Sequence, residues 1–177
     1  MSAPLDFRLT LYPDPILRKV AQPVAAFDDD LRATARAMLE LMYRSHGVGL
    51  AAPQVGLDRR ILVLNPSGDP EQKEGELALV NVRILERSGP SSLYEEGCLS
   101  FPEIYAEVRR PERCKVSAFT PDGGPLEREF EGFTSRVIQH EYDHLEGVLF
   151  VDRLTAGDKL RVKSLLLELE DQFRARA

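Results

Sequence analysis

The sequence predicts a single α+β domain, residues 1–177, with strands in the middle of the chain and helices near both ends. Segments rich in Val, Ile and Leu follow one another between residues 60 and 119. Helical periodicity precedes and follows them without alternating with them, which argues against a doubly wound parallel sheet. We therefore expect curved mixed or antiparallel sheets around a central helix that carries the sequence HEYDH, with an N-terminal and a C-terminal helix.

Before the strands, an extended arm leads into an amphipathic helix. Residues 8–25 contain three prolines, which favour extended backbone. An aspartate among residues 28–30 can cap a helix over roughly residues 30–45, and Gly47 lies just past its end. The apolar residues spaced along this helix are Leu31, Ala35, Met38 and Met42.

The central segments predict short strands and one hairpin. The segments "RILVLN" (60–65) and "LALVNVRIL" (77–85) have strand-like composition. A hairpin is predicted where "CKVSAF" (114–119) is followed by the turn "TPDGG" (120–124) and by "LEREFEGF" (126–133).

Two further helices are expected after the strands. One should run from about Thr134 to Glu146, with Gly147 as its stop. The sequence "TAGD" (155–158) matches a helix start signal. The helix that follows carries Leu160, Leu165, Leu166, Leu169 and Phe173.

Composition narrows the classes of function. A net charge of −6 disfavours specific DNA binding, because affinity for DNA comes mainly from Lys and Arg on phosphates. No apolar run approaches the ~20 residues of a membrane span, and the first residues lack the pattern of a signal peptide. We therefore expect a cytoplasmic protein. Two cysteines, Cys98 and Cys114, are too few for a disulfide scaffold.

The sequence "HEYDH" is the strongest indication of chemistry. His140 and His144 are two of only three histidines, and positions i and i+4 share one face of a helix. They can bind one metal ion, and Glu141 can accept a proton from water beside it. The alternative is a buried helix with two hydrogen-bonded histidines, which the apolar neighbours Val137 and Ile138 would also suit.

A catalytic centre of this kind needs a third protein ligand, and the residues alone leave it open. Position 150, where some metalloproteases have another histidine, is Phe150. We interpret His46 as a surface or capping residue. Glu168 or Glu170 could supply a carboxylate, as in another protease type. Cys98, in "EEGCLSFPE", is either a ligand or a buried structural thiol, and Cys114 is expected in the core.

Three stretches together resemble peptide deformylase. They are the loop "GVGLAAPQ" (47–54), the segment "EGCLS" (96–100) and "QHEYDHL" (139–145), in the order that this family shows. The opening "YPDPILRKVAQPV" (12–24) is also similar, so the resemblance spans nearly the whole chain. It implies an α+β fold and the removal of the N-formyl group from formylmethionine at the start of new polypeptides.

The resemblance also implies residue roles. Cys98, His140 and His144 would bind the metal, and Glu141 would be the general acid/base. Gln54 and the backbone N–H of Leu99 would stabilise the oxyanion. The residues expected to bind substrate are Val48, Gly49, Phe133 and Val137. Arg136 stands where some relatives are expected to have an apolar residue.

The implied cofactor is one divalent ion, Fe(II) in the native enzyme, with Zn, Ni or Co as substitutes. The implied partners are nascent chains, and the ribosome through the C-terminal helix. Near the site, Glu96 is expected to pair with Arg109 or Arg110. Two rivals remain: a zinc endopeptidase that uses a glutamate of the third helix, and a binding module whose metal only stabilises the fold.

Overall fold

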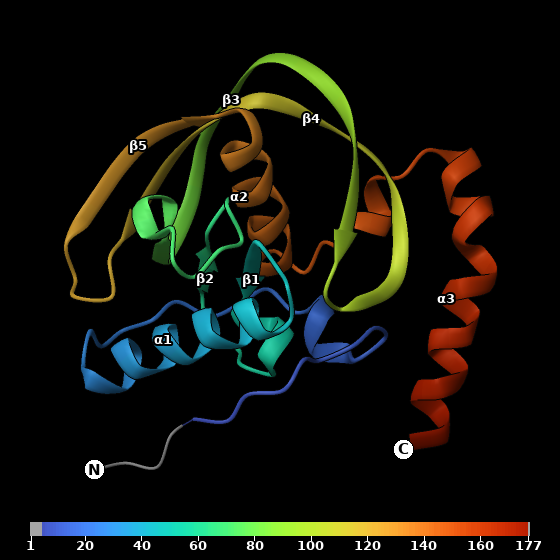
Figure 1. Ribbon diagram of the computed structural model, residues 1–177, viewed down its shortest axis with the longest axis horizontal. Helices are drawn as coiled ribbons and strands as arrows, with labels where there is room; N and C mark the ends of the chain where they lie inside the picture. The colour runs from blue at the N-terminus through green and yellow to red at the C-terminus, as the bar shows by residue number, and fades with distance from the viewer. Residues whose placement is uncertain (1–4, 177) are drawn as a thin grey trace.

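The computed structural model describes residues 5–176 and shows one five-stranded antiparallel sheet with three α-helices (Figure 1). Strand order follows the sequence, β1-β2-β3-β4-β5. The strands are β1 Gly49–Ala51, β2 Ile61–Leu64, β3 Leu77–Cys98, β4 Phe101–Phe119 and β5 Pro125–Glu131. The α-helices are α1 Asp29–Arg44, α2 Gly132–Leu145 and α3 Ala156–Arg176. The α+β class and the antiparallel pairing are confirmed, and the strands of the described residues form one sheet rather than several.

The strands β3 and β4 form one long hairpin, of which the sequence predicted only the two strand segments at its base, 77–85 and 114–119. The predicted hairpin of 114–119 with 126–133 is confirmed as the pairing of β4 with β5. They contain 22 and 19 residues, and their ribbons arch over α2 in Figure 1. The neighbours Gly89 and Pro90 are typical of a turn, yet here they lie inside β3. Gly89 has φ 77°, and the pairing register shifts between Ser88 and Ser91. This irregularity is a β-bulge that bends the hairpin without ending it.

The helix α2 packs on the sheet through its apolar residues. Val137, Ile138 and Leu145 share a buried cluster with residues of β2 and β4 such as Leu62 and Val116. The same packing leaves the remaining positions of α2 to polar side chains, most of which are also buried. The helix therefore carries its polar residues into the interior of the protein rather than into solvent.

Gly147 follows α2 and lets the N-terminal arm pass close to it. Its φ is 68°, and a Cβ added there would lie 2.4 Å from the carbonyl oxygen of Arg18. The Ala21 N–H donates to the Leu145 carbonyl at 2.9 Å, so the arm satisfies a carbonyl group at the helix end. The predicted stop at Gly147 is confirmed.

The outer helices are anchored differently. In α1, Asp28 accepts a hydrogen bond from the Leu31 N–H at 3.0 Å, which confirms the predicted cap. In α3 only Val162 and Leu169 are buried, and Leu160 is 73% exposed, so the predicted apolar row is largely not a core face. Within the described part of the chain, no helix is long and apolar enough to cross a membrane.

Candidate active site

The tip of the β3–β4 hairpin and α2 bring one sulfur and two imidazoles together. Cys98, the last residue of β3, pairs with Phe101, so the chain turns at Leu99 and the residue after it. His140 and His144 lie one turn apart on α2. One ligand atom from each of Cys98, His140 and His144 lies within 4.8 Å of the others. The Cys98 Sγ atom is 3.3 Å from His144 Nε2.

The 3.3 Å between Cys98 Sγ and His144 Nε2 is the separation of two ligands on one cation. Around a tetrahedral zinc ion, with bonds of ~2.3 Å to sulfur and ~2.0–2.1 Å to nitrogen, ligand atoms lie roughly 3.3–3.6 Å apart. Within residues 5–176, no other Cys, His, Asp or Glu side chains form such a group. Glu168 and Glu170 do not belong to it, and Glu170 instead accepts a hydrogen bond from Tyr12 at 2.8 Å.

The two imidazoles differ in how tightly they hold a proton. Burial lowers the pKa of His140, but its contacts with Cys98 and Glu96 outweigh burial and hold the pKa well above its ordinary value. Burial, followed by the positive charges of His140 and Arg110, holds the pKa of His144 well below its ordinary value. His144 therefore offers a free lone pair, whereas a cation must displace a proton from His140.

Glu141 lies in the same buried region. Its Oε2 atom is buried and has no hydrogen-bond partner among the described residues. Burial is the main reason that the pKa of Glu141 is raised to about 7. Its neighbour on β1 is Gly49, where an added Cβ would lie 2.5 Å from Glu141 Oε1. A carboxyl group with this pKa can both take up and release a proton near neutral pH.

The predicted oxyanion residues border the sulfur. Gln54 is fixed because its Oε1 accepts from the Ala51 N–H at 2.8 Å. Its Nε2 donates to Cys98 Sγ at 3.5 Å and to Ser100 Oγ at 3.3 Å. Leu99 follows Cys98 in the hairpin turn and lines the same cavity as Gln54. The amide is therefore held beside the group that would bind the metal.

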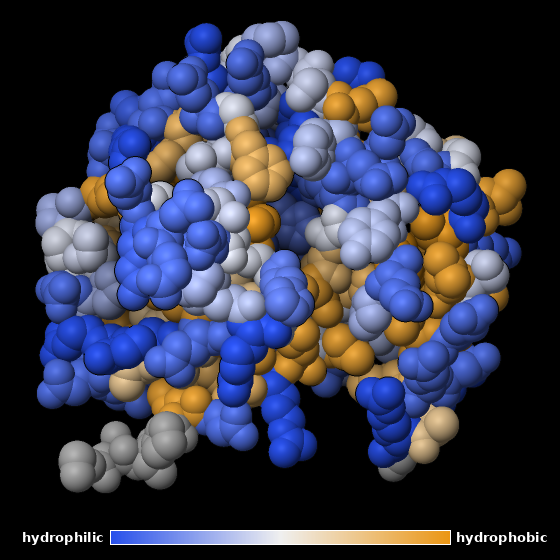
Figure 2. Space-filling model, in the orientation of Figure 1, coloured by the Kyte–Doolittle hydropathy of each residue, from blue (hydrophilic) through white to orange (hydrophobic). Residues whose placement is uncertain are grey.

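A cavity of about 730 Å³ opens beside these groups, and it forms a hollow near the centre of the face in Figure 2. All four residues predicted to bind substrate line it, namely Val48, Gly49, Phe133 and Val137. Cys98, Gln54, His140 and Glu141 line it too. His46, which is exposed as predicted, lies at its edge and has φ 57°.

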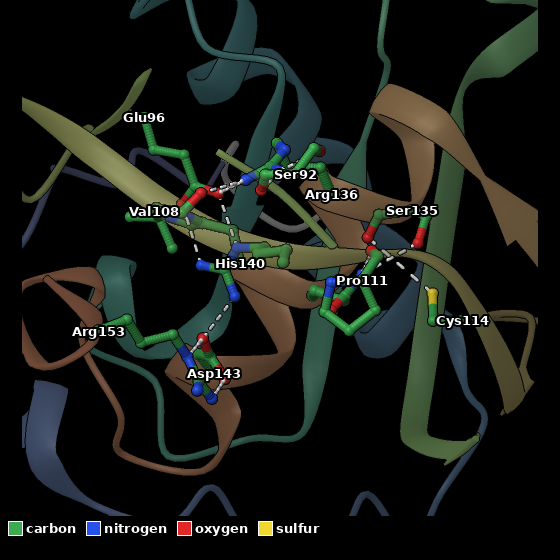
Figure 3. Close-up of polar contacts among 12 residues, drawn as sticks. Ser92, Glu96, Val108, Pro111, Cys114, Ser135, Arg136, His140, Asp143 and Arg153 are labelled. Atoms are coloured by element: carbon green, nitrogen blue, oxygen red, sulfur yellow. Dashed lines mark hydrogen bonds and ion pairs between the residues drawn. The ribbon is translucent and has the colours of Figure 1, made fainter. Parts of the chain in front are cut away.

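Behind His140 lies Glu96, a carboxylate that is only 6% exposed (Figure 3). Glu96 Oε2 is 3.0 Å from His140 Nδ1, which leaves His140 Nε2 for the sulfur side. Arg110 donates to both oxygens of Glu96, at 2.7 and 2.9 Å, and Arg136 donates to Oε1 at 2.8 Å. Burial would raise the pKa of Glu96, but the contacts with His140 and Arg110 lower it far below its ordinary value.

A second buried carboxylate, Asp143, extends this network. It accepts from Arg110 at 2.9 Å and from two nitrogens of Arg153, at 2.5 and 2.6 Å. The predicted partner of Glu96 was Arg109 or Arg110, and the structure selects Arg110. Arg109 instead contacts the Ser91 carbonyl at 3.5 Å. Asp143 and Arg153 were not predicted, because nothing local distinguishes them from solvated charges.

Comparison with known proteins identifies the family of this chain. Residues 7–160 match the family model of polypeptide deformylase. The chain belongs to the peptide deformylase family. Peptide deformylases are metal-dependent hydrolases that remove a formyl group, and this chain is such an enzyme. The resemblance stated from the three motifs is confirmed.

Individual peptide deformylases match over most of their length. The peptide deformylase of Thermotoga sp. strain RQ2 is 44% identical over 163 residues, which cover 92% of this chain and 96% of the relative. A crystal structure of Arabidopsis thaliana peptide deformylase 1B in complex with an inhibitor has a TM-score of 0.91 at 42% identity, covering 96% of this chain and 93% of that one. A Plasmodium falciparum peptide deformylase has a TM-score of 0.92 at 40% identity, covering 95% and 98%.

Proposed function

We propose that the cavity between β1, α2 and the β3–β4 hairpin hydrolyses the formamide of peptides that begin with N-formylmethionine. The products are formate and a free N-terminal amine. Cys98, His140 and His144 would hold the metal ion. The observation that carries this proposal is the convergence of these three ligand atoms within 4.8 Å, beside the unpartnered carboxylate oxygen of Glu141.

The chain's own residues then perform the proton transfers. A bound divalent cation supplies Lewis-acid activation of water and of the formyl carbonyl. Glu141 accepts a proton from the attacking water and passes it to the leaving amine, a role that its buried oxygen without a hydrogen-bond partner among the described residues supports. Gln54 Nε2 and the Leu99 N–H donate to the oxyanion, and the loss of one such donor typically costs about 3 kcal/mol of barrier.

The substrate chain is proposed to lie along β1. Gly49 belongs to this short edge strand, and its backbone can pair with an extended peptide. Val48, Phe133 and Val137 then form the pocket for the methionine side chain. Their presence in one cavity with Cys98 and His140 supports this assignment.

The native cation is proposed to be Fe(II), with Zn, Ni or Co able to replace it. One thiolate and two imidazoles suit each of these ions, so the family resemblance rather than the ligand set favours iron. An Fe(II) ion beside Cys98 should make the enzyme sensitive to oxygen, because the thiolate can be oxidised.

The remaining expectations stay predictions. We propose that residues 1–177 form one domain, that the enzyme acts in the cytoplasm, and that α3 contacts the ribosome. The exposed side of α3, which has only two buried residues, is available for such a contact.

Anaerobic measurement of formate release from formyl-Met-Ala-Ser, with metal analysis, tests the proposal. Wild-type protein should release formate and contain about one metal ion per chain. Replacing Cys98 by Ser should abolish metal binding. The zinc endopeptidase rival, which uses a glutamate of the third helix, predicts instead that the Cys98→Ser variant retains its metal.

A further inference from the structure

Arg136 is a buried cation for which the proposed chemistry has no use. It lies on α2 one turn before His140 and two turns before His144, so the three residues share a helix face. Its side chain is only 9% exposed. Burying a guanidinium is costly unless it is paired and hydrogen-bonded. Its contacts should therefore explain why it lies there.

Those contacts connect α2 to both strands of the long hairpin. Arg136 Nη1 donates to Glu96 Oε1 at 2.8 Å and to the Val108 carbonyl at 3.0 Å. Its Nη2 donates to the carbonyl and the hydroxyl of Ser92, at 2.9 and 3.2 Å. Ser92 and Glu96 belong to β3 and Val108 to β4. Figure 3 shows Arg136 between these partners.

The contact of Arg136 with Glu96 affects the proposed metal ligands in two ways. Glu96 Oε2 meets His140 Nδ1 at 3.0 Å, so the position of this carboxylate orients the imidazole. Glu96 also lies two residues before Cys98 in the same strand. Arg136 thus acts on the imidazole and on the sulfur through one partner.

We propose that Arg136 is a positioning residue for the metal centre. It fixes the α2 residues that precede His140 against the hairpin, and so sets the separation between the Cys98 sulfur and the imidazoles of His140 and His144. This inference rests on the proposed function, because it takes these three residues as the ligands.

Arg110 provides the matching connection on the other side of His140. It extends from β4 to Asp143, which follows His140 on α2, at 2.9 Å. Arg136 supplies the connection on the N-terminal side of His140. The segment of α2 that carries both imidazoles is therefore held to the hairpin at two points.

A rival role for Arg136 is that of a cavity wall. Arg136, Tyr94 and Phe133 line both the active-site cavity and a second cavity of about 430 Å³. The guanidinium carbon of Arg136 is 5.3 Å from the centre of the Tyr94 ring. A wall that only shapes the methionine pocket would affect KM and leave metal binding unchanged, whereas a positioning residue would affect metal binding.

The experiment compares Arg136→Met and Arg136→Lys with wild type. Zinc-loaded enzyme is titrated with a chelator to obtain the affinity for Zn²⁺, and kcat and KM are measured with formyl-Met-Ala-Ser. Arg60→Met is the matched control. Arg60 is 12% exposed, donates to the carbonyls of Val82 and Leu145 at 3.0 and 3.4 Å, and pairs with Glu146, but it does not contact Glu96.

The proposal predicts that Arg136→Met weakens Zn²⁺ affinity by about 10–100-fold, the usual effect of losing a group that orients a ligand, with KM within about twofold of wild type. Arg136→Lys should weaken the affinity by a smaller factor, since an ammonium keeps a positive charge to pair with Glu96 but cannot reach all of the other partners. Arg60→Met should keep wild-type affinity.

Wild-type Zn²⁺ affinity in Arg136→Met would overturn the proposal. If Arg136→Met does not fold, wild-type affinity in Arg136→Lys would overturn it instead. A rise in KM alone would assign Arg136 to the cavity wall. Failure of the wild-type enzyme to release formate would contradict the proposed function, which is a separate result.

Discussion

At the residue scale, Glu141 combines burial with the absence of a protein partner for one of its oxygens. Its Oε2 atom is buried without a hydrogen bond among residues 5–176, and its pKa is raised to about 7, mainly by burial. A carboxylate that only stabilised the fold would be expected to have its polar atoms paired. Its environment therefore suits proton transfer better than a structural role.

Replacing Glu141 by Gln keeps the shape of the side chain and removes its ability to carry a proton. Turnover of formyl-Met-Ala-Ser should fall by about 10²–10⁴-fold, while the folded state and the metal content stay as in wild type. Glu129→Gln, at an exposed position of β5, is the control and should keep full activity. Turnover of Glu141→Gln within a few-fold of wild type would favour a metal that only stabilises the fold.

Gly49 makes room for Glu141. An alanine Cβ at this position would lie 2.5 Å from Glu141 Oε1 and 2.8 Å from a methyl group of Val137, so the carboxylate must move. Since a misplacement of ~1 Å can cost about 10²-fold in rate, Gly49→Ala should lower kcat strongly and leave metal content unchanged.

The control for Gly49 is Gly157→Ala in α3, where the nearest atom to an added Cβ is 3.9 Å away. It should have wild-type kcat in the same formate assay. If Gly49→Ala is as active as this control, then the contact between β1 and Glu141 does not position the catalytic carboxylate.

The part of the site that lies on α2 could be predicted from the spacing of its residues in the sequence. His140, Glu141 and His144 lie on one helix, so their relation follows from helical geometry. Cys98 lies far before His140 in the chain, and only the family resemblance connected the two. The buried pairing of Glu96 with Arg110 and Arg136 depends on how α2 packs against the hairpin. No local pattern separates such charges from solvated ones.

At the element scale, helices were predicted better than strands. Asp28 predicted the start of α1 and Gly147 the end of α2, each to within a few residues. In β3, by contrast, the predicted strand ended at Leu85, because the residues that follow are mostly polar and include the pair Gly89–Pro90. They are strand residues because the partner β4 pairs with them across a bulge, which is a tertiary cause.

The arm and α3 are joined by the hydrogen bond from Tyr12 to Glu170, 2.8 Å long. Tyr12→Phe removes it and should lower the free energy of unfolding by about 0.5–1.5 kcal/mol at neutral pH, measured by denaturant titration. Tyr105→Phe, at a side chain 57% exposed, is the control and should have no effect.

The difference in the free energy of unfolding between wild type and Tyr12→Phe should become smaller at high pH. Burial and the carboxylate of Glu170 raise the pKa of Tyr12 to about 12, so the folded state holds this proton more tightly than the unfolded chain, where the pKa is about 10. The stabilisation is complete below pH ~10 and is lost as pH rises towards ~12. A difference between wild type and Tyr12→Phe that grows above pH ~10 would contradict this assignment.

At the scale of the whole molecule, we propose that the position of the hairpin tip limits the size of the acyl group that the site accepts. The hairpin tip brings Cys98 within 3.5 Å of the Gln54 amide, which leaves little room beside the ligand group. Formyl is the smallest acyl group, and one extra methyl typically costs 1–3 kcal/mol in a tight site, or about 10–200-fold. The value of kcat/KM for acetyl-Met-Ala-Ser should be lower than that for the formyl peptide by at least this range. Comparable values would contradict steric selection.

One thiolate and two imidazoles, from the tip of the β3–β4 hairpin and from α2, are proposed to bind a single catalytic metal ion. X-ray absorption spectroscopy of the zinc-loaded enzyme tests this proposal, because sulfur and nitrogen neighbours scatter the photoelectron differently in the fine structure above the zinc absorption edge. We expect one sulfur neighbour at ~2.3 Å, lost in Cys98→Ser, together with nitrogen or oxygen neighbours at ~2.0–2.1 Å. A spectrum of the wild-type enzyme without a sulfur neighbour would contradict it.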